Sequence, residues 1–291
     1  MLKIFLIFPL KYVIILTRDI SYSEDTFMKI NIGVSTASLY PLHVEDAFAE
    51  IARLGVKSAE VFANSTREAG EPYISQMCDI RDKNGMTVTS FHPFSSPMES
   101  VFLFSTYDRR IEEMVEMYSG FFGGMNKLGA KVFVLHGAIL SSKCTVSHYL
   151  DQFRMLSEVG REYGITVAQE NVHYCLSGRL DFLKMMKREL GDNAKFVLDL
   201  KQARRSGENP LEYIDSLSDS IVHCHLSDGD ESRDCLPVGK GKFDFTTFAR
   251  KMFSHGYNGA FIVELYRDNY GEFEELKNSV DVLSEIVDKI K

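Results

Sequence analysis

Four short apolar runs in the second half of the chain each end in a residue that can bind a metal ion or move a proton. These residues are Glu170, Asp199, His225 and Glu264. Carboxylates brought together at one point repel one another, and a divalent cation relieves that repulsion. Three carboxylates with one imidazole form an oxygen-rich, fairly hard ligand set that suits Mn²⁺ or Mg²⁺ best and also admits Co²⁺ or Zn²⁺. The quartet therefore predicts a site for one divalent ion, with Mn²⁺ the first choice; the alternative is a network of surface salt bridges.

Other polar residues occupy comparable places in the earlier runs. His92 and His136 each end an apolar run. A single histidine there is more often structural than a ligand, and we expect these two to hydrogen-bond substrate oxygens. Glu60 lies in another run, where an inward carboxylate would reach substrate hydroxyls or, equally, form a buried ion pair. Arg267, just beyond Glu264, would pair with an anionic substrate group or remain an ordinary exposed arginine.

These residues are carried by a regular alternation of β-rich runs and amphipathic segments. The β-rich runs are Lys29–Val34, Ser58–Phe62, Thr87–His92, Lys131–His136, Thr166–Glu170, Lys195–Leu200, Ile221–Leu226 and Ala260–Leu265. The segments with apolar residues at helical spacing are 44–54, 71–84, 107–128, 146–163, 179–190, 210–217, 245–255 and 271–290. Eight such units predict a closed (β/α)₈ barrel, which is typically about 250 residues long and builds its active site at the C-terminal edge of the strands.

Glycines mark several of the expected helix-to-strand turns. Examples are Asn84-Gly85-Met86 and Leu128-Gly129-Ala130, where glycine suits a helix C-terminal cap. An open doubly wound sheet is the competing fold. It would favour a glycine-rich phosphate-binding turn after the first strand, but residues 35–38 contain no GxGxxG pattern. We therefore expect one barrel domain over residues 28–291, without an internal linker.

The composition is that of an ordinary globular protein. The chain has 291 residues, of which 45% are hydrophobic and 25% are charged, and its net charge is −8. This acidic balance argues against a protein that binds phosphate backbones, so we expect no nucleic-acid partner. The five cysteines form no CxxC pair, which argues against a disulfide framework or a zinc ribbon and favours a reducing, cytoplasmic setting.

Residues 1–27 differ from the rest of the chain. This segment is apolar through its middle but is interrupted by Pro9 and Lys11. It is therefore too short and too broken for a bilayer span, which needs about 20 apolar residues. No small-residue cleavage site follows it, so a signal peptide fits poorly. Because Met28 directly precedes a β-rich run, we expect residues 1–27 to be an extension that is either upstream of the true start or disordered, and we expect no membrane association.

Six short motifs occur along the chain in a recognisable order. They are Leu135-His136-Gly137, Gln169-Glu170-Asn171, Leu198-Asp199-Leu200, His223-Cys224-His225-Leu226-Ser227-Asp228, Pro237-Val238-Gly239-Lys240-Gly241 and Val263-Glu264-Leu265. With them, the chain from about Met28 resembles the xylose isomerase-like TIM-barrel superfamily, which includes sugar isomerases and epimerases, dehydratases and endonuclease IV-type enzymes. In its mononuclear members, residues of strands 5 to 8 bind one divalent ion. The resemblance implies those roles for Glu170, Asp199, His225 and Glu264.

The chain departs from the family pattern at two places. Many members carry a histidine three residues after the strand-6 aspartate, where this chain has Gln202. We expect Gln202 to replace it as a neutral hydrogen-bond partner of the substrate. Endonuclease IV-like members also have an Asp-x-His pair, and Cys235 stands where its histidine would fall. Two missing ligands argue against a trinuclear zinc cluster and hence against a DNA-repair nuclease.

The resemblance also implies a reaction. In the family's ketose epimerases, the glutamates of strands 5 and 8 lie on opposite faces of the substrate. Glu170 and Glu264 would then hold the metal and exchange a proton, through an enediolate, at the carbon next to a carbonyl that the metal polarises. Return of the proton to the same carbon gives epimerisation, and return to the adjacent carbon gives isomerisation. We therefore predict an isomerase or epimerase acting on a sugar, a sugar phosphate or a related polyol.

Two other functions remain open on the same scaffold. One is a metal-dependent lyase, either of the 3-dehydroshikimate dehydratase type or cleaving a C-glycoside after its oxidation. The other is a catalytically inactive ligand-binding barrel, for which the missing histidine at Gln202 is the sequence hint. A small metabolite is the expected partner in each case. Homo-oligomers are common in the family, although no interface is specified by the sequence.

Overall fold

The computed structural model describes residues 30–290, which form a closed barrel of parallel strands in the order β1 to β8, with β8 pairing back to β1. The strands are β1 Asn31–Ser35, β2 Ser58–Ala63, β3 Thr87–Pro93, β4 Val132–Leu135, β5 Thr166–Glu170, β6 Phe196–Asp199, β7 Ile221–Leu226 and β8 Ala260–Val263. The fold predicted from the sequence is therefore confirmed. The expectation for residues 1–27 lies outside the described residues.

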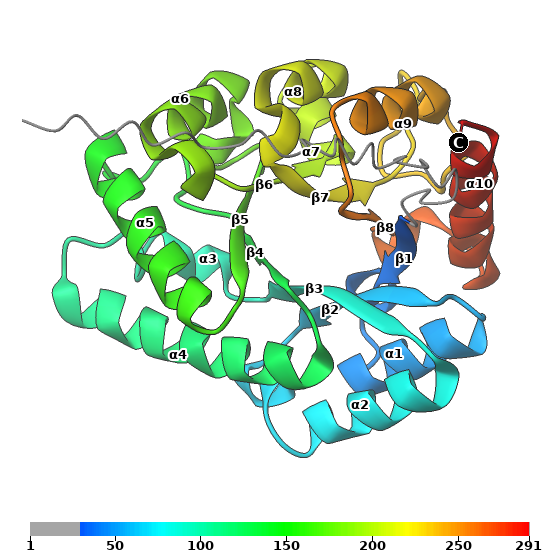
Figure 1. Cartoon of the computed structure of the whole chain (residues 1–291), viewed down its shortest axis with the longest axis horizontal. Helices are drawn as coiled ribbons and strands as arrows, with labels where there is room; N and C mark the ends of the chain where they lie inside the picture. Colours follow the sequence, from blue (N-terminus) through cyan, green and yellow to red (C-terminus); the bar gives the residue numbers. More distant parts are fainter. Residues whose placement is uncertain (1–29, 291) are drawn as a thin grey trace, which may run out of the picture.

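A ring of eight helices surrounds the strands (Figure 1). They are α1 Val44–Arg53, α2 Tyr73–Asn84, α4 Asp108–Leu128, α5 Val146–Glu162, α6 Leu180–Leu190, α8 Pro210–Leu217, α9 Phe245–Ser254 and α10 Glu274–Ile290. Short 3₁₀ turns lie at Thr36–Leu39, Thr66–Ala69, Leu176–Gly178, Gly191–Asn193, Ser218–Ser220 and Arg267–Asn269. The bounds expected from periodicity differ from the observed ones by no more than three residues. None of the helices within residues 30–290 is long and apolar enough to cross a membrane.

Two short helices were not expected from the sequence. Helix α3 Ser96–Glu99 lies between β3 and α4, and helix α7 Leu200–Arg205 begins directly at the end of β6. Each occupies only one or two turns, which is too short for a hydrophobic period to be recognised. Helix α7 matters for the site because it turns the chain back over the barrel mouth immediately after Asp199.

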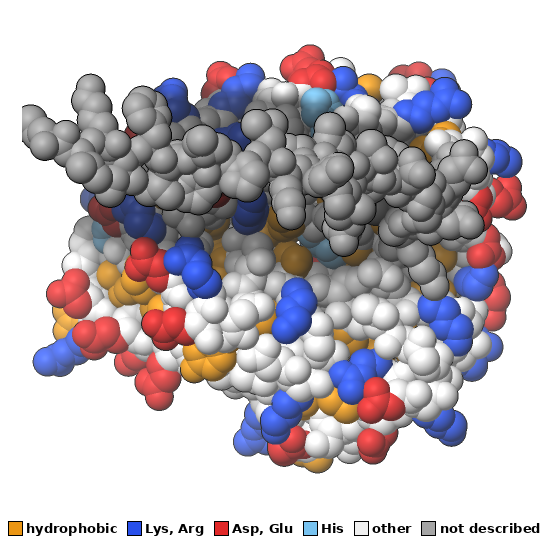
Figure 2. Space-filling view, in the orientation of Figure 1, with side chains coloured by type: hydrophobic (Ala, Val, Ile, Leu, Met, Phe, Trp, Pro, Cys, Tyr) orange, Lys and Arg blue, Asp and Glu red, His pale blue; other side chains and the backbone are white. Residues whose placement is uncertain are grey.

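The main hydrophobic core lies between the strands and the surrounding helices, where Phe48, Phe122, Phe133 and Phe261 are fully buried. The predicted glycine caps are present: Gly85 and Gly129 end α2 and α4 in the left-handed region, at φ 59° and 83°. On the face shown in Figure 2, acidic and basic side chains are interspersed over the lower part of the view, where α2 and α4 lie. The barrel thus places the ends of eight strands at one edge, above a well-packed core.

Candidate metal centre

The four residues predicted as metal ligands meet at the C-terminal edge of the barrel. Glu170 and Asp199 are the last residues of β5 and β6, His225 lies near the end of β7, and Glu264 directly follows β8. One ligand atom from each lies within 4.8 Å of the ligand atoms of the other three. All four side chains are buried. Consecutive parallel strands therefore bring three carboxylates and one imidazole to one point.

The neighbours of Glu170 hold the adjacent strands in register. The Asn171 side chain accepts from the backbone N–H of Asp199 at 2.7 Å and donates to its carbonyl at 3.0 Å. Gln169 Nε2 donates to the carbonyls of Leu135 and His136, each at 2.9 Å. The Gln-Glu-Asn motif thus clamps β5 to β4 on one side and to β6 on the other.

Asp199 is oriented by helix α7. Its Oδ1 accepts from the backbone N–H of Gln202 at 3.0 Å and so caps the helix N-terminus. Its Oδ2 is buried and lies 3.3 Å from Lys201 Nζ, while the buried Glu170 Oε2 lies 2.8 Å from His136 Nε2. Buried carboxylates that crowd at one point are costly unless cations satisfy them, and the ligand atoms of the quartet all lie within 4.8 Å of one another. This donor set therefore fits a divalent ion, in agreement with the preference of such ions for oxygen ligands.

His225 is held from below by Glu60. Its Nε2 lies 3.0 Å from Glu60 Oε2, while its Nδ1 lies 3.1 Å from Glu170 Oε1. Burial would lower the pKa of His225, but Glu60 and Glu264 outweigh burial and raise that pKa well above its usual range. Carboxylates thus flank both nitrogens, and the pairing with Glu60 directs Nδ1 toward the quartet. Such an outer carboxylate is a common way of fixing a metal-binding histidine.

Glu60 itself lies one layer below the barrel mouth. It is mid-strand in β2 and fully buried, and its Oε2 accepts from Ser90 Oγ at 2.8 Å. His223 Nε2 lies 3.1 Å from the same oxygen. The structure therefore shows the contacts of the expected buried ion pair. The alternative role of Glu60, a contact with substrate hydroxyls, stays a prediction.

His92 and His136 stand on the other side of Glu170. His136 Nε2 lies 2.8 Å from Glu170 Oε2 and 2.8 Å from His92 Nε2. Together with Glu170, these two histidines form a second group whose atoms lie close enough to hold an ion. Both rings also line the pocket above the quartet, where a substrate oxygen could contact them.

The pocket above the quartet has a volume of about 750 Å³. Besides members of the quartet and the two histidines, the residues that line it are Ala37, Tyr40, Pro41, Phe62, Asn64, Tyr174, Lys201, Gln202, Leu265, Tyr266, Arg267 and Asp268. Tyr40 is 61% exposed and Tyr266 is 44% exposed, so aromatic rings stand at the entrance. Aromatic faces at an entrance suit the apolar faces of a sugar ring or a similar ligand.

Gln202 and Arg267 reach this pocket but are already engaged. Gln202 Oε1 lies 2.7 Å from His173 Nδ1, in a contact that the sequence did not indicate. The Arg267 guanidinium lies over the Tyr270 ring at 4.8 Å and donates to the Tyr270 carbonyl at 2.9 Å. Both residues therefore present their remaining polar atoms to the pocket from fixed positions.

The sequence predicted no role for Lys201, but the structure places its ammonium group next to two residues of the quartet. Its Nζ is 3.0 Å from Glu264 Oε2 and 3.3 Å from Asp199 Oδ2. Burial would lower the pKa of this lysine, but Asp199 and Glu264 outweigh burial and hold the pKa well above its usual range. Its place in the sequence, two residues after Asp199, was the one indication that it could lie near the site. The turn of the chain into α7 is what brings its side chain to Asp199 and Glu264.

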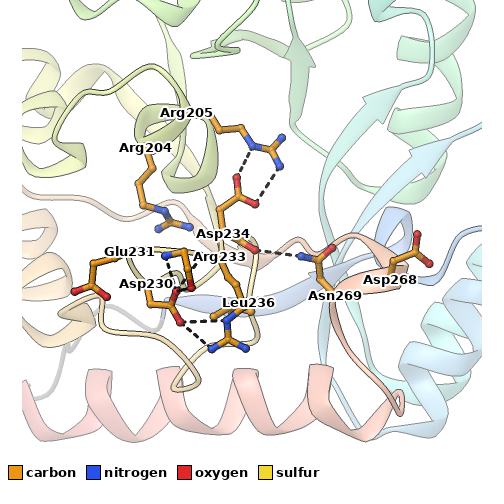
Figure 3. Close-up of a pocket in the computed structure, with 10 residues that line it drawn as sticks. Arg204, Arg205, Asp230, Glu231, Arg233, Asp234, Leu236, Asp268 and Asn269 are labelled. Atoms are coloured by element: carbon orange, nitrogen blue, oxygen red, sulfur yellow. Dashed lines mark hydrogen bonds and ion pairs between the residues drawn. The ribbon is translucent and has the colours of Figure 1, made fainter.

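A second cavity, of about 660 Å³, adjoins the pocket, and Asp268 lines both (Figure 3). Arg205 marks their boundary: it is paired with Asp234 at 2.5 Å and donates from Nη1 to the Tyr266 hydroxyl at 2.8 Å. Arg233 and Asp230 form another pair in this cavity. Arg205 and Lys201 both lie near the Tyr266 ring.

The glycine-rich turn of the Pro237–Gly241 motif has a structural role. Asp228, at the end of the His223–Asp228 motif, accepts from the backbone N–H groups of Gly239, Gly241 and Phe243 at 2.9–3.0 Å. It also accepts from Gly229 N–H at 2.8 Å. A buried carboxylate with four backbone donors fixes this turn beside the barrel mouth.

A carboxyl group behind His136 leads to a pH prediction. Glu99 is fully buried, accepts from Tyr118 Oη at 2.9 Å and from Gly137 N–H, and burial raises its pKa to about 7. A glutamate ordinarily titrates near 4.5. The folded protein therefore keeps a proton that the unfolded chain loses, and stability falls by up to about 3 kcal/mol as the pH rises from about 4.5 to about 7.

Glu99→Gln tests this prediction because glutamine does not ionise. The free energy of unfolding of the variant, relative to the wild type, should rise between pH 5 and pH 8 in urea titrations. A difference that stays constant over this range would show that Glu99 does not titrate there.

Comparisons with known proteins agree with the fold. A family model described as xylose isomerase-like TIM barrel matches residues 48–286. A D-tagatose 3-epimerase-like protein superimposes with a TM-score of 0.75 at 19% identity, covering 90% of this chain and 98% of that chain. D-psicose 3-epimerase, determined with D-fructose, gives 0.73 at 14% identity and covers 89% and 99%. The IOLI protein with a bound zinc atom gives 0.73 at 16% identity and covers 90% and 99%.

Proposed function

The chain belongs to the xylose isomerase-like TIM-barrel family, and from this premise we propose that it is a divalent-metal-dependent isomerase or epimerase of a sugar or a related polyol. The observation that carries the proposal is the buried quartet of Glu170, Asp199, His225 and Glu264 at the base of an open pocket. The similar structures support the choice of substrate class, since two of them are described as a D-tagatose 3-epimerase-like protein and a D-psicose 3-epimerase.

The quartet has two tasks in this proposal. All four residues would hold the ion, which supplies Lewis-acid polarisation of a substrate carbonyl and so acidifies the neighbouring C–H group. Glu170 and Glu264 both line the pocket, so their carboxylates can remove a proton from the substrate and return one to it. Return to the same carbon from the other face inverts it, and return to the adjacent carbon moves the carbonyl.

The surrounding side chains orient the substrate. His92 and His136 present imidazole nitrogens next to Glu170 and can hydrogen-bond substrate hydroxyls. Gln202 and Arg267 also line the pocket and offer further polar contacts. Tyr40 and Tyr266 at the entrance limit the access of water once a ligand is bound.

Metal content and hydrogen exchange test the proposal together. The full chain, purified without added metal or chelator and then supplied with Mn²⁺, should hold about one divalent ion by elemental mass spectrometry. A ketose should exchange its α-hydrogen with deuterium oxide, followed by NMR, only when the ion is present.

Three results would contradict the proposal. Absence of bound metal after Mn²⁺ has been supplied removes the mechanism. Absence of exchange across a broad panel of sugars removes the substrate class. Appearance of a conjugated product by ultraviolet absorbance would assign elimination in place of isomerisation.

A further inference from the structure

The centre contains a cation of its own. Lys201 is 2% exposed, and its ammonium group lies between Asp199 and Glu264, at 3.3 Å and 3.0 Å from their oxygens. A lysine buried this deeply is rare unless it is paired. Here, both of its ionic partners are residues that we propose as metal ligands.

The ammonium group is also fixed from above. Lys201 Nζ lies 4.7 Å from the centroid of the Tyr266 ring, in the geometry of a cation–π contact. Arg205 Cζ lies 5.2 Å from the centroid of the same ring, and Nη1 of Arg205 donates to its hydroxyl. Arg205 is in turn paired with Asp234 (Figure 3). A chain of contacts from the neighbouring cavity thus holds Lys201 in place.

Lys201 brings a positive charge into a centre where carboxylates outnumber the charge of one ion. Glu170, Asp199 and Glu264 carry three negative charges, whereas a divalent ion supplies two positive charges. Glu60 lies one layer lower, in contact with His223 and with His225 of the quartet. The ammonium of Lys201 supplies the third positive charge at the two carboxylates that it contacts.

We propose that Lys201 is the built-in counter-cation of this centre: it holds Asp199 and Glu264 in place before a metal ion binds, and its charge weakens the binding of a divalent ion. The inference rests on the metal site of the proposed function. It makes Lys201 a positioning residue, because it acts through two ligands. Two like charges near one group of carboxylates repel each other, so removal of the lysine charge should strengthen metal binding.

Lys201→Met tests both parts of the inference, because methionine is a long, unbranched side chain like lysine but carries no charge. In chelator-treated protein, the melting temperature of the variant should fall by about 5–10 °C, because the carboxylates of Asp199 and Glu264 lose their partner. Its affinity for Mn²⁺, measured by electron paramagnetic resonance of the free ion, should rise at least about tenfold. Lys242→Met, which removes a lysine that is 70% exposed and paired with Glu231, should change neither value.

A double variant separates charge from packing. Lys201→Met combined with Glu264→Gln removes one positive and one negative charge, and its melting temperature in chelator should recover most of the loss. Additive losses in the double variant would show that Lys201 acts by packing alone and would overturn the inference. An unchanged or weaker affinity of Lys201→Met for Mn²⁺ would overturn it as well.

The two proposals fail in different ways. A wild-type chain that binds no Mn²⁺ contradicts the proposed function. In that case, the measurements in chelator still decide whether Lys201 holds the carboxylates. A wild-type chain that binds Mn²⁺, beside a Lys201→Met variant with unchanged stability and affinity, contradicts the inference on Lys201 alone.

Discussion

Replacing Glu264 with glutamine should slow the exchange of the substrate's α-hydrogen by about 10²–10⁴-fold, which is the usual contribution of a positioned acid–base group. The amide cannot remove a proton, yet its oxygen can still accept from Lys201, which now lies 3.0 Å from Glu264 Oε2. The fold should therefore change little. Glu170→Gln should show a loss of similar size. NMR exchange rates at saturating Mn²⁺, measured beside the bound metal per chain, give the result.

A surface glutamate provides the control for this prediction. Glu285→Gln removes a carboxylate that is 72% exposed and paired with Lys289 on α10, and it should keep the wild-type rate. If either Glu264→Gln or Glu170→Gln exchanges hydrogen within about threefold of the wild type while holding its metal, that glutamate is not the acid–base group.

Truncation of Glu60 to alanine should lower the free energy of unfolding by about 3–5 kcal/mol, as expected when one partner of a buried ion pair is removed. Burial opposes the ionisation of Glu60, but His225 and His223 outweigh burial and hold its pKa well below its usual range. The alanine variant leaves these two buried imidazoles and Ser90 without their shared acceptor. Urea denaturation of chelator-treated protein measures the loss.

The milder Glu60→Gln variant separates stability from metal binding. Glutamine keeps one oxygen as an acceptor for His225 but loses the charge, and the affinity for Mn²⁺ should fall by about 10–100-fold, as for other outer partners of metal-binding histidines. Glu285→Ala on the surface should change the unfolding free energy by less than about 0.5 kcal/mol. Unaltered stability and metal affinity in both Glu60 variants would show that the ion pair below the centre has no role.

The barrel could be predicted from the sequence because its signals are local. Each strand is a short apolar run, each helix carries apolar residues at helical spacing, and glycines such as Gly85 and Gly129 close the helices. Eight repeats of a strand followed by a helix predict a single closed barrel. Helix α7 was not predicted because it is short and begins at Leu200, which was expected to be the last residue of a strand.

The candidate site was predictable in part for the same reason. Glu170, Asp199 and Glu264 stand at or directly after the last residues of their strands, and parallel strands end at a common edge. Residue type and place in the run were therefore enough to group them with His225. The sequence did not indicate how far below the barrel mouth Glu60 lies. Strand β2 continues for three residues beyond it before it reaches the C-terminal edge of the barrel.

The sequence by itself determined which strand ends carry carboxylates and imidazoles, since that depends only on the order of residues along each run. The tertiary structure alone decided how these groups are paired. Lys201 reaches Asp199 and Glu264 because α7 begins at Asp199 and turns the chain back. Gln202 meets His173 because the segments after β5 and β6 lie side by side, and Glu60 on β2 reaches His225 on β7 across the interior of the closed barrel. Such contacts depend on strand register and side-chain depth, which no local pattern encodes.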